Sequence, residues 1–197
     1  MCWVRVFRKL QILVLREETM PTCAIRSTSL TEKLEIYRAT SARYRQWYAD
    51  QEDVGGRCLY WSLTLMGVLL QKGYRALIQA GSMSWPIVPA GQDDGKSSTH
   101  FSYEWSPWRE ESQAALKLGL LPEIHVWVGL PDQNELLDFS TRGFPQQAAK
   151  EGLVWQTPAP PDFLWCGPSD LPEGVIYRPN MDAIGFILNR ISKTTHR

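Results

Sequence analysis

Three side chains that could carry out nucleophilic catalysis occur in the order Cys58, His125 and Asp138 in a chain of 197 residues. Cys58 directly follows Gly55-Gly56-Arg57 and opens an apolar segment. At a helix N-terminus the unpaired N–H groups carry partial positive charge, which favours a thiolate, and Arg57 adds to that charge. The two glycines allow a tight turn whose backbone N–H groups could stabilise an oxyanion. The stretch therefore predicts an activated cysteine nucleophile.

The other two groups fall on neighbouring predicted strands. His125 lies in the run 123–130 and Asp138 in the run 135–140, and the turn residues Pro131-Asp132-Gln133-Asn134 separate them. Such a spacing is typical of an antiparallel hairpin, in which residues of adjacent strands meet on one sheet face. The imidazole would then accept the thiol proton while the carboxylate orients the ring.

This arrangement resembles the transglutaminase-like branch of the papain-like cysteine enzymes. The matching stretches are Gly56-Arg57-Cys58-Leu59 with the helix that follows, His125-Val126-Trp127-Val128, and Leu137-Asp138-Phe139-Ser140-Thr141. The cysteine helix is also similar to that of the leader-peptidase proteins of lasso-peptide pathways. The resemblance covers roughly residues 55–142, and it departs from the family at Val126, where alanine is usual, and at Phe139, where proline is usual.

The resemblance implies an α+β fold, a papain-like or transglutaminase-like core in which a buried cysteine helix packs on an antiparallel sheet. It implies acyl transfer at an amide bond of a peptide or protein substrate, without a cofactor. Hydrolysis, deamidation and cross-linking use the same active-site groups, so peptidase, deamidase and transglutaminase all stay open. A second hypothesis is a non-catalytic binding domain on the same fold, in which Cys58 is buried and inert.

Several further residues are candidates for substrate or oxyanion contacts. Gln46, Trp47 and Gln51 precede the cysteine, Arg57 adjoins it, and Trp127 follows the histidine. His100 is an alternative base, because it opens a second predicted strand that carries Glu104 on the same face. A metal site is not expected, since Cys58, His100 and His125 show no paired ligand spacing.

The surrounding pattern predicts the elements that hold these residues. Gly73 should end the buried helix, and Asn180 should cap a C-terminal helix. The predicted helices are 31–48, 58–72, 108–118 and 181–191; the predicted strands are 74–80, 99–105, 123–130 and 135–140; and the segments 86–96 and 155–173 are expected to be loop and extended chain.

Composition limits the function classes. The chain has 21 Lys+Arg, 21 Asp+Glu and 44% hydrophobic residues, including 9 Trp, 7 Tyr and 6 Phe. These values exclude a mainly disordered chain and give no basic excess for nucleic acid. Neither a membrane span nor a signal peptide is expected, and four scattered cysteines form no C-x-x-C pair, so a cytoplasmic location is expected.

The chain is interpreted as one domain with an N-terminal appendage. Residues 1–19 form the appendage, before a possible internal start at Met20, and residues 20–197 form a single catalytic-type domain. The oligomeric state is not predicted.

Overall fold

The computed structural model describes residues 28–48, 57–89, 99–118 and 123–194. The predicted appendage 1–19, Met20, Gln51 and the glycine pair at 55–56 lie outside these residues. The start-site and appendage predictions therefore remain predictions. None of the described helices is both long enough and apolar enough to cross a membrane.

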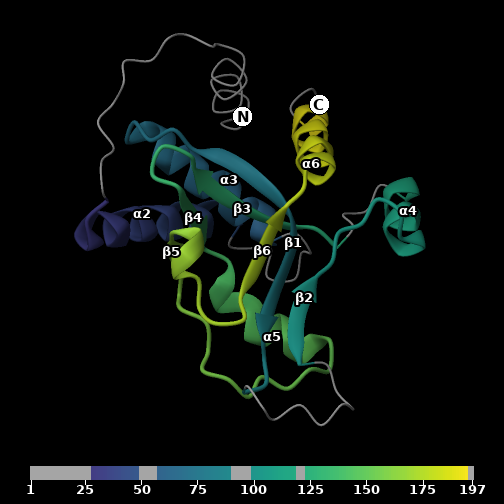
Figure 1. Ribbon diagram of the computed structural model, residues 1–197. Coiled ribbons are helices and arrows are strands. Elements are labelled where there is room, and N and C mark those ends of the chain that lie inside the picture. The colour runs from purple at the N-terminus through teal and green to yellow at the C-terminus, as the bar shows by residue number, and fades with distance from the viewer. Residues whose placement is uncertain (1–27, 49–56, 90–98, 119–122, 195–197) are drawn as a thin grey trace.

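The fold is α+β, with helices around a curled antiparallel sheet (Figure 1). The six-stranded sheet has the order β2-β1-β3-β4-β5, and β6 also pairs with β1. The strands are β1 Leu77–Pro86, β2 His100–Tyr103, β3 His125–Leu130, β4 Glu135–Asp138, β5 Leu164–Cys166 and β6 Ile176–Pro179. The predicted 123–140 hairpin is confirmed as β3 and β4, paired at Val128–Leu137.

The long strand β1 has partners on both edges. Met83 and Ser84 pair with β2 and also with β6, so these two strands must flank opposite edges of β1. Along β1, β3 pairs with residues 77–81 and β6 with residues 81–84. At this junction a side chain on Gly81 would collide with the backbone carbonyl of Arg178, so the close approach of β6 requires a glycine.

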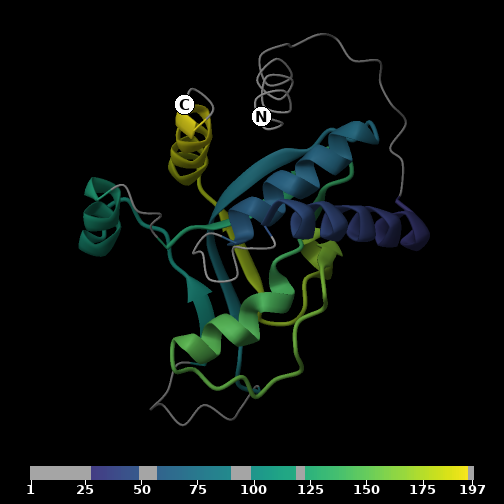
Figure 2. The ribbon, with the colours of Figure 1, turned by 180° about the vertical axis from the view of Figure 1, so that it is seen from behind.

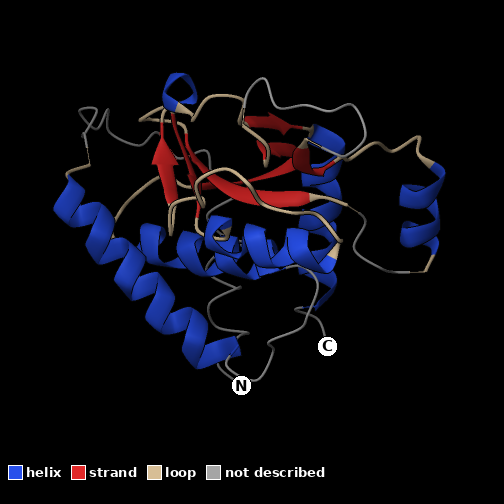
Figure 3. Ribbon diagram, turned by 90° about the horizontal axis from the view of Figure 1, so that it is seen from below, coloured by secondary structure: helices blue, strands red, loops and turns tan. Residues whose placement is uncertain are grey.

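Helices α2 and α3 lie on one face of the sheet (Figure 3). Helix α2 crosses the outer side of α3 (Figure 2), and Tyr44 of α2 stacks on Trp61 of α3 with ring centroids 3.9 Å apart. Gly73 has φ 83° and donates to the Leu70 carbonyl, so the glycine cap predicted for the buried helix is confirmed. The α-helices are α2 Leu30–Tyr48, α3 Arg57–Gln71, α4 Glu110–Lys117, α5 Phe144–Lys150 and α6 Met181–Thr194; short 3-10 turns occupy Thr141–Gly143 and Pro168–Asp170.

The sheet separates two hydrophobic cores. Side chains such as Leu65 and Leu69 of α3 pack on Val126 and Val128, which project from one face of β3. On the opposite face Trp127 packs with the strands and α5 in a second core. This alternation along β3 follows from the period-two geometry of a strand, and it places His125 on the Trp127 side.

Some element predictions need correction. The strand predicted at 74–80 begins instead at Leu77. It continues to Pro86, the residue at which the loop was expected to begin. Small residues at Gly81, Ser82 and Ser84 weaken the apolar alternation, yet Met83 is buried and the strand continues because both of its edges are paired. Helix α5 and strands β5 and β6 were not predicted, and β5 lies within the proline-rich stretch expected to be merely extended. The C-terminal helix is confirmed: the side chain of Asn180 accepts hydrogen bonds from the N–H groups of Asp182 and Ala183.

Candidate active site

Cys58 lies in the first turn of α3, the position expected from the sequence. The packing of α3 on β3 brings this turn to the start of that strand. The thiol is buried, with 8% of the residue exposed, and Sγ lies 4.0 Å from the carbonyl oxygen of Ile124. Because Ile124 directly precedes His125, the sulfur lies next to the histidine along the strand. The helix N-terminus and the strand start thus meet at one point.

His125 and Asp138 form a buried ion pair. Asp138 follows Leu137 on β4, and continuing the Val128–Leu137 register places it opposite Trp127, two residues from His125 on the same sheet face. The distance between His125 Nε2 and Asp138 Oδ2 is 2.6 Å, and the two side chains are 0% and 1% exposed. A pair this short and this buried is a strong, charge-assisted hydrogen bond.

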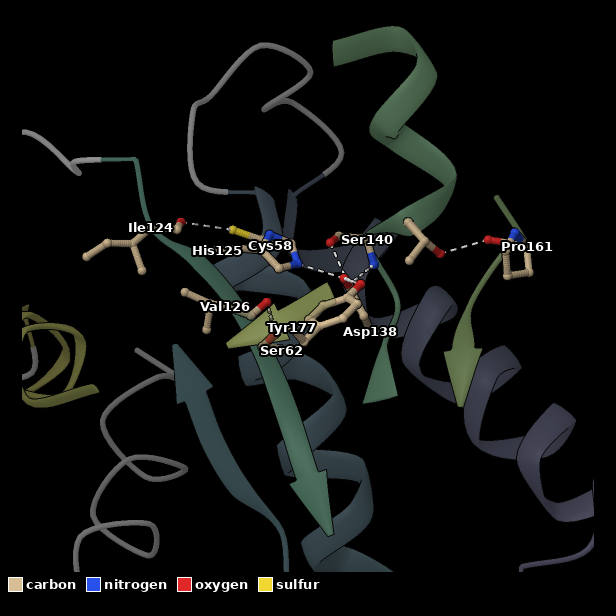
Figure 4. Close-up of polar contacts among 10 residues, drawn as sticks. Cys58, Ser62, Ile124, His125, Val126, Asp138, Ser140, Pro161 and Tyr177 are labelled. Carbon is tan, nitrogen blue, oxygen red and sulfur yellow. Dashed lines mark hydrogen bonds and ion pairs between the residues drawn. The ribbon is translucent and has the colours of Figure 1, made fainter. Parts of the chain in front are cut away.

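The carboxylate of Asp138 receives four hydrogen bonds (Figure 4). Ser140 donates its backbone N–H (2.8 Å) and its hydroxyl (2.6 Å) to Oδ1. His125 Nε2 and the hydroxyl of Tyr177, at 2.8 Å, both donate to Oδ2. An ionised carboxylate has about four lone-pair sites, so this set of donors saturates it.

These contacts move the pKa values of the pair apart. Burial alone would lower the pKa of His125, but the charge and hydrogen bond of Asp138, together with Cys58, outweigh burial and raise it to about 10. Burial would raise the pKa of Asp138, yet the charge of His125 and the hydrogen bonds of His125 and Ser140 hold it below its usual value. At neutral pH the pair is therefore imidazolium and carboxylate.

The second ring nitrogen of His125 is directed toward the cysteine. Nδ1 is buried and makes no hydrogen bond of ordinary geometry to any part of the chain that the structure describes. Cys58 nevertheless lies close enough to help raise the pKa of His125, and the sulfur lies beside the ring on the side away from Asp138 (Figure 4). A small rotation of the thiol from the Ile124 carbonyl toward Nδ1 would complete the chain from sulfur to carboxylate.

Aromatic rings surround the imidazole. Tyr103 stacks on it at a centroid distance of 5.3 Å and Trp127 at 5.9 Å, while Phe144 meets it edge to face at 5.5 Å and Tyr177 lies at 5.8 Å. Ring faces attract a cation and exclude water. Trp127, a candidate for substrate contact, is buried and forms one wall of this enclosure.

The structure does not bring His100 to this site. His100 pairs with Pro86 of β1 whereas His125 pairs with Gly81, so they lie about 16 Å apart along the strand. Gly81 and Pro86 are five residues apart on β1, and an odd separation puts two strand residues on opposite faces of the sheet. Their partners His125 and His100 therefore point to opposite faces as well. Glu104, expected on the same strand face, lies beyond the end of β2 and forms an ion pair with Arg109 at 3.2 Å.

The other expected contacts are only partly placed. Gln46 and Trp47 are exposed on α2, unlike the buried thiol. The guanidinium of Arg57 lies 3.5 Å from the side-chain oxygen of Gln146 at the surface. Gln51 lies outside the described residues. Among the residues that the structure describes, no three His, Cys, Asp or Glu side chains gather in a way that could hold a metal ion.

Two partners of the pair were missed by the sequence analysis. Ser140 had a local signal, because a serine two residues after an aspartate often closes a turn with it. Tyr177 had none, since it comes from a strand that was not predicted.

Comparison with known proteins gives little further information. The sequence matches no protein-family model and no curated protein. One solved structure, described as "The crystal structure of genomics APC5867", is similar with a TM-score of 0.45 and 12% identity, over 89% of this chain and 82% of that chain.

Proposed function

We propose that this protein is a cysteine-dependent acyl-transfer enzyme that acts on an amide bond through Cys58, His125 and Asp138. The observation that supports it best is the buried 2.6 Å pair of His125 and Asp138 next to the thiol at the start of α3. Perturbed, mutually oriented titratable groups of this kind are typical of catalytic sites. A papain-like, transglutaminase-like core is part of the proposal: a cysteine helix packs on an antiparallel sheet whose adjacent strands carry the histidine and the aspartate.

In the first step Cys58 reacts as a thiolate, because its proton is already held on Nδ1 of the His125 imidazolium, and the sulfur attacks the carbonyl carbon of the amide. The new C–S bond converts the carbonyl to a tetrahedral oxyanion, which backbone N–H groups near the helix N-terminus could stabilise. Collapse of this intermediate breaks the C–N bond, and the imidazolium returns its proton to the departing amine. A thioester on Cys58 remains.

In the second step an acceptor attacks the thioester. His125 takes a proton from water or from an amine, the acceptor forms a bond to the carbonyl carbon, and the C–S bond breaks with the electron pair going to sulfur. Asp138 keeps its negative charge throughout and stabilises the imidazolium. Water would make the protein a peptidase or deamidase, and an amine would make it a transglutaminase; a peptide or protein is the proposed substrate.

The proposal is tested by the rate at which iodoacetamide alkylates Cys58, measured by mass spectrometry between pH 5 and 9. The partly exposed Cys166 is a comparison within the same chain. An activated Cys58 should react faster than Cys166 at pH 6, despite being more buried. A glutamine-containing peptide, assayed for ammonia release with and without an added primary amine, then separates deamidation from cross-linking.

The alternative of a non-catalytic binding domain draws support from the burial of Cys58 and its contact with the Ile124 carbonyl. It predicts the opposite labelling order. If Cys58 is alkylated only after denaturation, the enzyme proposal fails and the binding domain takes its place.

A further inference from the structure

Tyr177 approaches the candidate site from a distant part of the chain. It lies 39 residues after Asp138, on β6, and its hydroxyl donates to Oδ2 of Asp138 at 2.8 Å. Strand β6 reaches this position because it pairs with β1, where Tyr177 is opposite Met83. The absence of a side chain at Gly81 allows β6 to come this close.

Oδ2 is also the oxygen that accepts the hydrogen bond from His125 Nε2. The other oxygen, Oδ1, is held on the opposite side by both donors of Ser140. With donors on both oxygens, the carboxylate cannot rotate about its Cβ–Cγ bond without breaking hydrogen bonds in a buried site, which is costly. Tyr177 and Ser140 together thus determine which oxygen faces the imidazole.

The tyrosine ring contributes as well as its hydroxyl. It packs edge to face on Trp127 at a centroid distance of 5.2 Å, and Trp127 stacks on the imidazole. Both rings restrict the imidazole to the orientation in which Nε2 meets Asp138 and Nδ1 faces the cysteine. Burial and Asp138 raise the pKa of Tyr177 well above its usual value, so the phenol remains a proton donor throughout the working pH range.

We infer that Tyr177 is a positioning residue of this site: its hydroxyl fixes the Asp138 carboxylate so that His125 presents Nδ1 to Cys58. The inference rests on the proposed function. It adds Tyr177, from strand β6, to the three catalytic residues as the fourth member of one hydrogen-bonded chain. Tyr177 touches neither the thiol nor a reacting atom; it acts through Asp138.

The test is Tyr177→Phe in the full chain, which removes one oxygen and keeps the ring. The rate of Cys58 alkylation should fall about tenfold at pH 6, because a hydrogen bond to a charged group in a buried site is lost. The low-pH limb of the rate profile should move to higher pH, since a carboxylate with fewer donors is protonated more easily. Tyr74→Phe is the matched control: Tyr74 is also buried, and its hydroxyl meets Thr28 at 3.2 Å at the opposite end of α3.

A purely structural role would lower stability without moving the pH profile. If Tyr177→Phe folds and its alkylation rate falls off at the same acidic pH as in the unaltered protein, the inference is overturned. If Tyr177→Phe does not fold, proton NMR of the unaltered protein decides instead. Slowly exchanging resonances of the Tyr177 hydroxyl and the His125 Nε2–H, with a nuclear Overhauser effect between them, are expected; their absence would contradict the inference. Failure of the proposed function is distinguishable, because Cys58 would then be unreactive in the unaltered protein as well.

Discussion

Asp138 is not directly opposite His125 in the hairpin but one diagonal step along it, opposite Trp127. This offset brings the carboxylate to Nε2 at 2.6 Å and leaves Nδ1 directed toward Cys58. A directly opposed pair would bring the two Cβ atoms to about 5 Å, too close for an extended imidazole to point along the strand. The offset thus determines which ring nitrogen is available to the thiol.

The first prediction concerns Asp138→Asn. The amide has one acceptor oxygen instead of two, and its NH₂ group would face donors of Ser140 or Tyr177. We expect alkylation of Cys58 at pH 6 to slow about 100-fold, because the imidazolium loses its counter-charge. Circular dichroism should show that the variant is folded. A folded variant with unchanged reactivity would remove Asp138 from the mechanism.

The second prediction separates the two histidines. His125→Ala should abolish the enhanced reactivity of Cys58 at pH 6, since it removes the imidazole that takes the thiol proton. His100→Ala should change the rate less than about twofold, because His100 lies on the other sheet face. Parallel alkylation curves measure both. The reverse result would move the site to β2.

The third prediction is the pH dependence of stability. The pKa of His125 is raised from 6.5 to about 10, so its stabilising contribution is complete below pH 6.5 and is lost as the pH rises toward 10. Between these values the folded state binds one more proton than the unfolded state. The free energy of unfolding should therefore fall by up to about 1.4 kcal/mol per pH unit.

Urea denaturation of the unaltered protein and of His125→Gln, from pH 6 to pH 9, isolates this contribution. The difference in stability between the two proteins should shrink steadily as the pH rises. Asp138 gives the opposite sign: because its pKa is lowered, its contribution is present above about pH 4 and is lost in acid. A constant difference across the range would show that His125 is neutral in the folded protein.

The fourth prediction concerns Gly81→Ala. The added methyl group would collide with the carbonyl of Arg178, so β6 must move away from β1. A loss of about 2 kcal/mol or more is expected from urea denaturation. Because Tyr177 lies on β6, Cys58 alkylation should also slow. Gly67→Ala, where the space is open, is the control; equal effects of both substitutions would refute this explanation.

The local elements of the site could be predicted from sequence because their signals are short-range. An apolar run after two glycines and ended by Gly73 indicates a helix that begins near Cys58, and a four-residue turn at 131–134 indicates the hairpin. The order of thiol, imidazole and carboxylate, and the adjacency of the last two, follow from these elements alone.

What only the tertiary structure decided is which groups surround that pair. Tyr177 reaches Asp138 through pairing of β6 with β1, nearly a hundred residues apart, and no local pattern encodes such a pairing. His100 looked equivalent to His125 as a strand histidine, and only the β1–β2 register places it on the other face. Strand register depends on burial of whole faces and on long-range hydrogen bonds, because a shift of one residue reverses every side chain.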